Sequence, residues 1–162
     1  RIAMRPGRPM AVGRIAADGL QGKNGSSRGE KRASSYQKDT TPQTGGAVLF
    51  GLPGNPVAVM VTFLAFVRPA LLRMMGCTRP APPLLRALCT EAIRKKPGRT
   101  EYQRGTVTTA ADGTLQVRTT GNQGSGVLSS MVQANGLIVL HHGQGNVAPG
   151  EAVDVMVFDG VI

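Results

Sequence analysis

A tight turn between two apolar segments constrains the fold of this chain more than any other feature. The turn LPGNP at residues 52–56 follows the apolar residues 47–52 and precedes a longer apolar run. Gly54 can take a positive φ, and Asn55 is a good N-cap. Pro56 suits the first helical position, where a backbone N–H would have no partner anyway. The pattern predicts a short buried strand, a turn and a helix, which is the building block of an α/β layered fold.

The apolar run after the turn predicts a helix from about Pro56 to Met75. Gly76 should end the helix as its C′ residue, and Pro69 should kink it by removing one backbone hydrogen bond. The longest apolar stretch, residues 57–67, is interrupted by Thr62 and is shorter than the roughly 20 residues that a membrane-spanning helix needs. We therefore expect no membrane span.

The last half of the chain consists of short strand-like runs, which follow a Pro-rich linker at residues 77–83. Turn signals such as Asp112-Gly113 and Pro149-Gly150 separate these runs, and valines alternate with other residues from Val153 to Val157. The expected strands are Leu84 to Ile93, Glu101 to Thr109, Leu115 to Thr119, Val127 to Met131, Gly136 to Leu140 and Glu151 to Phe158. Several short strands in about 80 residues predict a small β-barrel or sandwich.

The fold class that follows is an α/β fragment and then a small all-β barrel domain. Residues 17–46 interrupt the first part, and they are rich in Gly, Ser, Thr and charge but poor in apolar side chains. Such a segment cannot repay the entropy of ordering, so we expect a disordered surface insertion. Met10 to Ile15 could form a short strand, and the abrupt start at Arg1 suggests a chain that lacks preceding sequence.

The net charge of +10 indicates an anionic partner. The basic residues are concentrated early, because residues 1–46 carry nine Lys and Arg against three acids. Nucleic acid is the usual partner of such a charge, but the chain has no Trp and only two Tyr, so it lacks the stacking platforms of single-strand binders. A small anionic ligand is the better hypothesis, and no nucleic acid is expected.

Two parts of the chain near its start carry candidate anion-binding groups. The turn 52–56 combines backbone N–H groups with the partial positive charge of a helix start; an ordinary N-capped turn is the alternative. The cluster Arg1, Arg5 and Arg8 surrounds a Pro-Gly turn, and its guanidinium groups suit a tetrahedral oxyanion. A solvated basic loop is the alternative for this cluster.

A third candidate lies in the expected barrel. The segment 102–105, which contains Arg104, could meet the Gly-rich segment 121–125, which bears the hydroxyl of Ser125, on one barrel rim. The alternative is a paired surface arginine beside a plain hairpin.

Other features are interpreted as structural. On a strand, His141 and His142 would point to opposite faces, so they could not readily share a metal. The basic run 94–99 is typical of a solvated turn. Cys77 and Cys89 fit neither a zinc site nor a disulfide framework, and we expect both to be reduced, buried thiols.

Five blocks of the chain, taken together and in order, resemble a known family. They are RPGRPMAVGRI, LFGLPGNPVAVMVTFLAFVRPALLRMMG, EYQRG, TTGNQGSGVLSSMVQANGLIVL and GEAVDVMVF. They look like the last third to half of the MoeA and gephyrin E-domain family, the molybdopterin molybdotransferases. The resemblance implies that residues 1–76 end an α/β molybdopterin-binding domain, that residues 84–162 form a C-terminal β-barrel domain, and that the family's N-terminal half is missing.

The resemblance implies an enzyme that works as part of a longer, cytoplasmic, dimeric chain. The reaction is magnesium-dependent: molybdate reacts with adenylylated molybdopterin, the metal is delivered to the dithiolene sulfurs, and AMP is released. The Mg²⁺ ligands are expected in the N-terminal part, so the present chain alone is expected to be inactive. A non-catalytic scaffold of the gephyrin E-domain type is the alternative function.

The family's substrate site falls on residues already singled out. The residues expected to bind molybdate or the pterin substrate are Arg5, Arg8, Pro9, Pro53, Gly54, Asn55, Pro56, Arg104 and Ser125. The chain departs from the family in several respects, one of which is that the insertion at residues 17–46 is longer than the family's usual connection. The family usually has lysines at the positions of Arg5 and Arg8, which keeps the charge but changes the hydrogen-bond geometry. It commonly has a serine where this chain has Ala58.

Overall fold

The computed structural model describes residues 3–7, 9–16, 46–124 and 126–158. The chain divides into two compact units, one made of Arg1–Met10 and Leu52–Ile162 and the other of Ala11–Gly51. The predicted insertion at 17–46 lies outside the described residues except for Gly46. The predicted boundary between domains at residues 77–83 stays a prediction.

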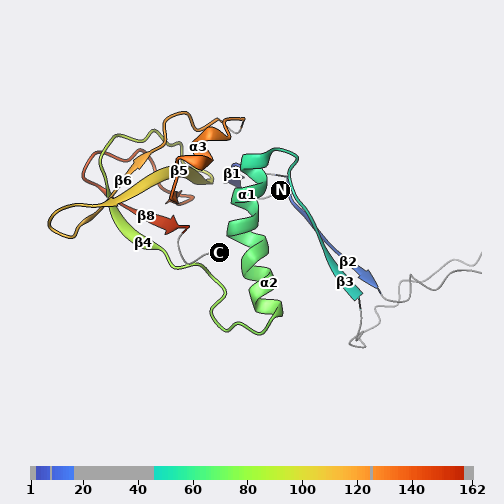
Figure 1. The fold of residues 1–162 in the computed structure, drawn as a ribbon. Helices are drawn as coiled ribbons and strands as arrows, with labels where there is room; N and C mark the ends of the chain where they lie inside the picture. The colour runs from blue at the N-terminus through green and yellow to red at the C-terminus, as the bar shows by residue number, and fades with distance from the viewer. Residues whose placement is uncertain (1–2, 8, 17–45, 125, 159–162) are drawn as a thin grey trace, which may run out of the picture. The chain divides into compact units, whose positions relative to one another are not determined.

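A closed β-barrel dominates the first unit (Figure 1). Its strands are β4 (Leu85–Cys89), β5 (Thr100–Thr109), β6 (Leu115–Thr119), β7 (Gly136–Leu140) and β8 (Ala152–Val157). Among the described residues these five strands pair in the cyclic order β5–β6–β4–β8–β7–β5, so the ring has no open edge. Every pairing in the ring is antiparallel except that of β4 with β6. The short strand β1 (Met4–Arg5) adds to β5 in parallel. The predicted small barrel is confirmed.

The barrel interior is filled by small and branched apolar side chains. The buried cluster consists of Ala87, Cys89, Ile93, Val117, Ile138, Leu140, Val147, Val153 and Val155. Val153 and Val155 are 1% and 0% exposed, while Asp154 between them points outward, so the predicted alternation along β8 is confirmed. Cys89 is a buried free thiol whose pKa is raised by burial, and Cys77 is free and half-buried.

One of the strands predicted for the barrel is absent, so that prediction is wrong. Residues 127–131 were expected to be extended, but the chain turns there into the short helix α3 (Ser129–Val132). The hydroxyl of Ser130 donates to the carbonyl oxygen of Val127 at 2.6 Å, and the backbone N–H of Ser130 donates to the same oxygen at 3.2 Å. This local side-chain bond to the backbone competes with strand pairing. The strands predicted at 115–119 and 136–140 coincide with β6 and β7.

One helix runs from Pro56 to Met74 in three consecutive segments, α1 (Pro56–Thr62), the π-helical η2 (Phe63–Val67) and α2 (Arg68–Met74). Asn55 caps its start as predicted, because its side-chain Oδ1 accepts the N–H of Ala58 at 3.1 Å. Gly54 does not adopt the positive φ that was considered for it. The predicted N-cap and the proline at the first helical turn are therefore confirmed.

Pro69 is accommodated without ending the helix. The π-helical segment lies directly before it, and the N–H of Arg68 donates to the carbonyl oxygen of Phe63, five residues back. A wider turn of this kind adjusts the backbone where a proline removes a donor. Gly76 follows the helix with φ +91°, and the N–H of Cys77 donates to the Leu72 carbonyl at 2.9 Å. This is the Schellman arrangement predicted for a glycine at C′.

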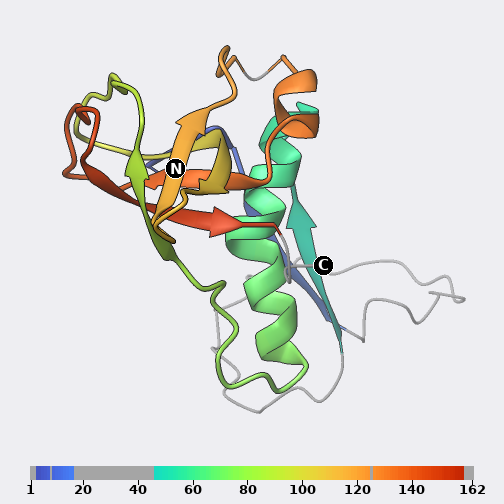
Figure 2. The same ribbon diagram turned by 60° about the vertical axis from the view of Figure 1, so that its left-hand side comes forward.

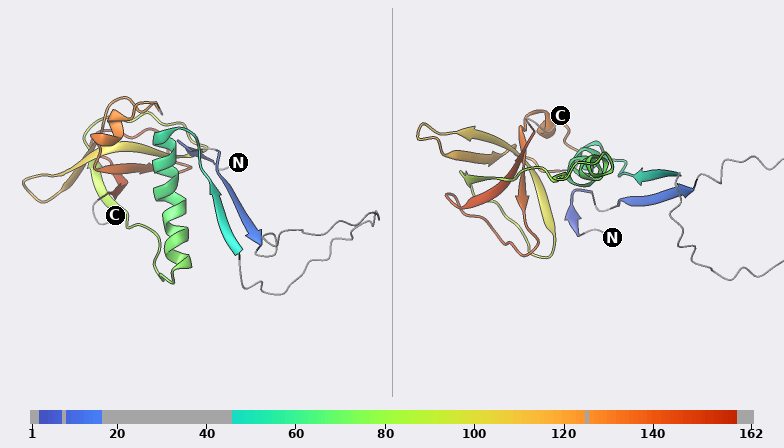
Figure 3. Two further views of the ribbon diagram at one scale, coloured as in Figure 1. Left: turned by 45° about the vertical axis from the view of Figure 1, so that its right-hand side comes forward. Right: turned by 90° about the horizontal axis from the view of Figure 1, so that it is seen from below.

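The helix packs against the outside of the barrel, and Figure 3 shows it nearly end-on beside the strands. A second buried cluster joins Val61 of the helix to Leu137 and Val139 of β7 and to Met156 of β8. By length and composition alone the helix could cross a membrane, since it has 19 residues and a mean hydropathy of 1.8. That is weak evidence, because a helix that packs on a protein core passes the same test.

The second unit contains an antiparallel pair of strands, β2 (Ala11–Ala16) and β3 (Gly46–Gly51), which lie side by side in Figure 2. The strand predicted at 47–52 is present, but the prediction that it is buried is wrong, since Leu49 is 58% exposed. Among the described residues, β3 pairs with β2 and with no further strand. The strand, turn and helix occur in the predicted order, and their assignment to an α/β layered domain stays a prediction.

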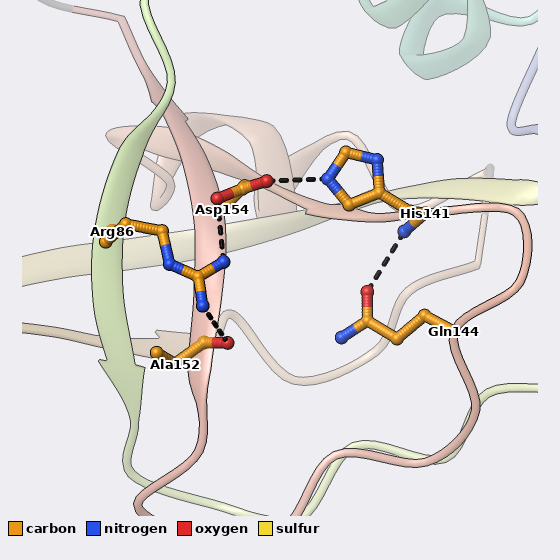
Figure 4. A network of polar contacts seen from close by, with 5 residues as sticks. All are labelled: Arg86, His141, Gln144, Ala152 and Asp154. Carbon is orange, nitrogen blue, oxygen red and sulfur yellow. Dashed lines mark hydrogen bonds and ion pairs between the residues drawn. The ribbon is translucent and has the colours of Figure 1, made fainter.

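A surface network ties β4 to β8 on the outside of the barrel (Figure 4). Asp154 lies at its centre: its Oδ1 is 2.9 Å from Nη1 of Arg86, and its Oδ2 is 2.6 Å from Nε2 of His141. Because a carboxylate can only accept, Nε2 of His141 must carry a proton. The hydrogen bonds from His141 and then from Arg86 hold the pKa of Asp154 below its ordinary value.

We predict that Asp154→Asn lowers the free energy of unfolding by about 0.5–1 kcal/mol at pH 7, the usual range for a partly exposed ion pair. A carboxyl with a depressed pKa stabilises the fold above its unfolded pKa of about 3.9, and this contribution is lost as the pH falls through the folded pKa. Urea unfolding at pH 7 and at pH values below 4 should show the difference between the two proteins shrinking. A difference that is the same at every pH would contradict this account.

Candidate functional site

A large cleft lies within the first unit, beside the N-terminal end of the helix that starts at Pro56. Its volume is about 1330 Å³. It brings together residues that are distant in sequence, from the segments 4–9, 53–58, 92–99, 101–104 and 119–123 and from Asn146. The cleft exceeds the roughly 300–1,000 Å³ of pockets that hold drug-sized ligands, so it has room for a sizeable molecule.

The charge of the cleft lining is strongly positive. Its cationic side chains are Arg5, Arg94, Lys95, Lys96, Arg99 and Arg104. Among the described residues that line it, Glu101 provides the one carboxylate. Glu101 is 6% exposed, and its two oxygens accept hydrogen bonds from Arg99 at 2.9 Å and from Gln103 at 3.2 Å. Since this acid is already paired, most of the positive charge is left without a counter-ion from the lining.

Arg5 reaches the cleft because successive side chains of β1 point to opposite faces of the strand. Met4 is 2% exposed and packs in the cluster under the helix, so the next side chain must point the opposite way. Arg5 is exposed, and its register partner in β5 is Glu101. Within the described part of the chain the Arg5 guanidinium makes no hydrogen bond or ion pair, so its donors are available to a ligand.

The Pro-Gly turn after Arg5 is held against the helix. Gly7 has φ +101°, and a Cβ built there would overlap the hydroxyl oxygen of Thr62. Only glycine fits this close approach without strain. Thr62 is fully buried, and its hydroxyl has no hydrogen-bond partner among the residues that the structure describes. The contact fixes the segment that carries Arg5 to the first turns of the helix.

Arg104 holds the loop 122–124 in place. Its Nε donates to Oγ of Ser130 at 3.0 Å and its Nη1 to the carbonyl of Gln123 at 3.1 Å. Its Nη2 donates to the carbonyl oxygens of Asn122 at 3.2 Å and Gly124 at 3.0 Å. Four of the five N–H donors of a guanidinium are thus engaged.

Arg104 is also a buried charge, with 1% of its surface exposed. Its hydrogen-bond partners are neutral, and no described carboxylate pairs with it. Burial first, and then the charge of Arg5, lowers the pKa of Arg104 below its ordinary value. A buried cation without a counter-ion favours an anion nearby, because an anion offsets part of the desolvation cost.

The start of the helix offers fewer N–H donors than its sequence suggests. Pro56 has none, the N–H of Ala58 is taken by the Asn55 side chain, and the N–H of Val59 donates to the carbonyl of Asn55 at 2.8 Å. The turn 53–56 therefore contributes shape and the partial charge of the helix start more than a set of free donors.

The comparisons with known proteins agree with one another. The family described as "MoeA C-terminal region (domain IV)" matches residues 86–158. A molybdopterin molybdenumtransferase of Haemophilus influenzae is 31% identical over 163 residues, which is 100% of this chain and 33% of that protein. The chain belongs to the MoeA family.

Further relatives extend the match. Molybdopterin molybdenumtransferase 2 of Mycobacterium tuberculosis is 29% identical over 155 residues. The matched region is 96% of this chain and 30% of that protein. The chain thus spans about a third of the length of these curated relatives. A molybdenum cofactor biosynthesis protein of Pyrococcus furiosus superposes with a TM-score of 0.62 at 25% identity, over 96% of this chain and 43% of that chain. A MoeA structure from Pyrococcus horikoshii superposes with a TM-score of 0.57 at 27% sequence identity. The match covers 67% of this chain and 27% of that chain.

Most of the residues expected from MoeA resemblance meet in one place. The cleft lining includes Arg5, Pro9, Pro53, Gly54, Asn55 and Arg104. Pro56 follows this set in sequence but is absent from the lining. Arg8 and Ser125 lie outside the described residues. The assignment of these residues to molybdate or pterin binding stays a prediction.

The sequence interpretation missed the basic run 94–99, which was taken for a solvated turn. Arg94, Lys95, Lys96 and Arg99 all line the cleft, and Lys95 is 5% exposed. The run itself was the available signal, but its charge alone does not reveal that the barrel turns it toward Arg5. The pairing of β1 with β5, in which Met4 lies opposite Thr100, brings Arg5 close to the end of this run.

We predict that Arg104→Ala lowers the free energy of unfolding by about 2–4 kcal/mol, since it leaves several buried acceptors unpaired. Arg104→Lys should recover only part of this loss, because an ammonium cannot reproduce the planar fork of donors. The exposed Arg118 provides a control, and Arg118→Ala should change stability by less than about 0.5 kcal/mol. Urea unfolding checks all three. Equal stability of the Arg104→Ala and Arg118→Ala variants would contradict the role of Arg104 in holding the loop 122–124.

Proposed function

We propose that this chain acts in molybdenum cofactor biosynthesis as the cleft-bearing part of a molybdopterin molybdotransferase. In this proposal the cleft binds molybdate next to adenylylated molybdopterin, and the complete enzyme transfers the metal to the pterin dithiolene with release of AMP. The names of the relatives support the pathway, and the chemistry of the cleft supports the choice of anionic substrates.

The observation that carries the proposal is the excess of unpaired positive charge in the cleft. Two of its cations, Lys95 and Arg104, are buried with neutral hydrogen-bond partners. Arg5 adds a guanidinium whose donors are not engaged by described residues. A tetrahedral dianion such as molybdate needs donors and positive charge without a competing carboxylate. Glu101, the register partner of Arg5, is the one carboxylate on the described lining, and its oxygens already accept hydrogen bonds from Arg99 and Gln103.

The individual residues then have distinct roles. Arg5 makes the direct contact with the oxyanion, because its guanidinium can donate two aligned hydrogen bonds. Arg104 acts mainly by its charge and by shaping the loop 122–124, since most of its donors are engaged in that loop. The role expected for Arg104 as a direct molybdate ligand thus becomes a role in positioning.

Magnesium belongs to the expected reaction, but the described residues do not form a site for it. No group of three or more His, Cys, Asp and Glu side chains occurs among them, and Mg²⁺ requires oxygen ligands in near-octahedral geometry. The paired carboxylate of Glu101 is the one acid on the described cleft lining. No role of the residues above therefore depends on the metal.

A scaffold of the gephyrin E-domain type is the second candidate function. One observation favours it: an apolar groove of about 560 Å³ lies between the helix and the barrel. Its lining is Val59, Met60, Phe63, Leu64, Arg68, Met131 and Phe158. The scaffold function predicts that the cleft has no particular affinity for molybdate, whereas the transferase function requires it.

We predict that Arg5→Gln weakens molybdate binding by the 162-residue chain about tenfold or more, because a charge-assisted hydrogen bond contributes roughly 1.5–3 kcal/mol and tenfold corresponds to about 1.4 kcal/mol. Isothermal titration with sodium molybdate at constant ionic strength measures this effect. Arg118→Gln removes the same charge from β6 outside the cleft and should change the affinity less than twofold. Equal losses in the two variants would reduce the effect to net charge and overturn the proposed role of Arg5.

A further inference from the structure

The cleft is larger than one oxyanion can use. A volume of about 1330 Å³ would remain mostly empty around a single molybdate ion. The cationic residues of the lining also come from separate parts of the chain, Arg5 from β1 and residues 94–99 from the segment between β4 and β5. A ligand with a second anionic group would use both parts.

The segment 94–99 is rigidly attached to the barrel through its backbone and through Lys95. The backbone N–H of Lys95 donates to Oδ1 of Asn146 at 2.9 Å, and its ammonium donates to the carbonyl of Gln144 at 2.7 Å. The N–H of Gly98 donates to the carbonyl of His142 at 2.9 Å. The conformation of this segment therefore does not depend on the side chains of Arg94 and Lys96.

Arg94 and Lys96 lie on either side of Lys95, and their side chains contribute no polar contact to the fold within the described residues. Both side chains are exposed, both line the cleft, and neither makes a hydrogen bond or ion pair with a described residue. Lys95 between them is 5% exposed, and its ammonium bonds only carbonyl oxygens among the described groups. Three consecutive cations, one of them buried without a counter-ion, are held at a fixed place on the cleft wall.

We propose that Arg94, Lys95 and Lys96 form a second anion subsite that binds a phosphate group. The guanidinium of Arg94 can bind two phosphate oxygens at once, Lys96 adds a mobile point charge, and buried Lys95 supplies a fixed positive potential. This inference rests on the proposed function, in which the phosphate groups belong to the adenylylated pterin. The subsite shares no residue with the Arg5 end, so the two anionic groups of the reaction are bound by different parts of the chain.

Inorganic pyrophosphate is a suitable probe because it carries the phosphate chemistry without requiring a pocket for a base or a pterin. We expect the double variant R94Q/K96Q to lower pyrophosphate affinity at least tenfold in isothermal titration at constant ionic strength. Its affinity for molybdate should change less than twofold. Because both side chains are exposed and unpaired, its melting temperature should equal that of the unmodified chain, which confirms that it folds.

The matched control is R79Q/R118Q, which removes the same two charges from exposed positions outside the cleft. It should change pyrophosphate affinity less than twofold. Equal weakening in the two double variants, or no weakening in R94Q/K96Q, would overturn the subsite. If pyrophosphate binding depends on Arg94 and Lys96 while molybdate binding is insensitive to Arg5→Gln, the subsite stands and the proposed function fails.

Discussion

Strand β5 is the element on which the rest of the structure depends. It pairs with β6 and β7 inside the barrel and with β1 outside it, so the same ten residues close the barrel and attach the segment that carries Arg5. Glu101 and Arg104 of this strand line the cleft, one as a paired acid and the other as a buried clamp of the loop 122–124. The pairings of β5 therefore connect the barrel to the cleft.

The electrostatics of the cleft follow from the same arrangement. Burying Lys95 and Arg104 against carbonyl oxygens carries a desolvation free energy, and no ion pair with a described carboxylate offsets it. An anion bound in the cleft would offset part of that cost, which is the physical basis of the proposed function. Burial first, and then the charge of Arg5, lowers the pKa of Arg104 below its ordinary value, as expected for a cation without a nearby carboxylate.

Local sequence signals predicted the local structure well. The cap at Asn55, the Schellman end at Gly76 and the strands β6 and β7 follow from short-range chemistry, and all were confirmed. The errors arose where contacts beyond the usual short-range signals determine the conformation or the exposure of a segment. Residues 127–131 turn into α3 where the hydroxyl of Ser130 bonds the backbone, and β3 is exposed because among the described residues it pairs only with β2. The basic run 94–99 was expected to be a solvated turn; its place on the cleft was missed because it depends on the pairing of β1 with β5, which the local sequence does not reveal.

The central claim is that the cleft binds a tetrahedral oxyanion at the end that carries Arg5. A crystal of the 162-residue chain soaked in tungstate, which has the shape and charge of molybdate and scatters anomalously, tests it most directly. The account predicts an anomalous peak within hydrogen-bond distance of the Arg5 guanidinium, next to the turn 53–56. A peak only on other surfaces, or no peak in the cleft at a concentration that saturates binding in solution, would contradict it.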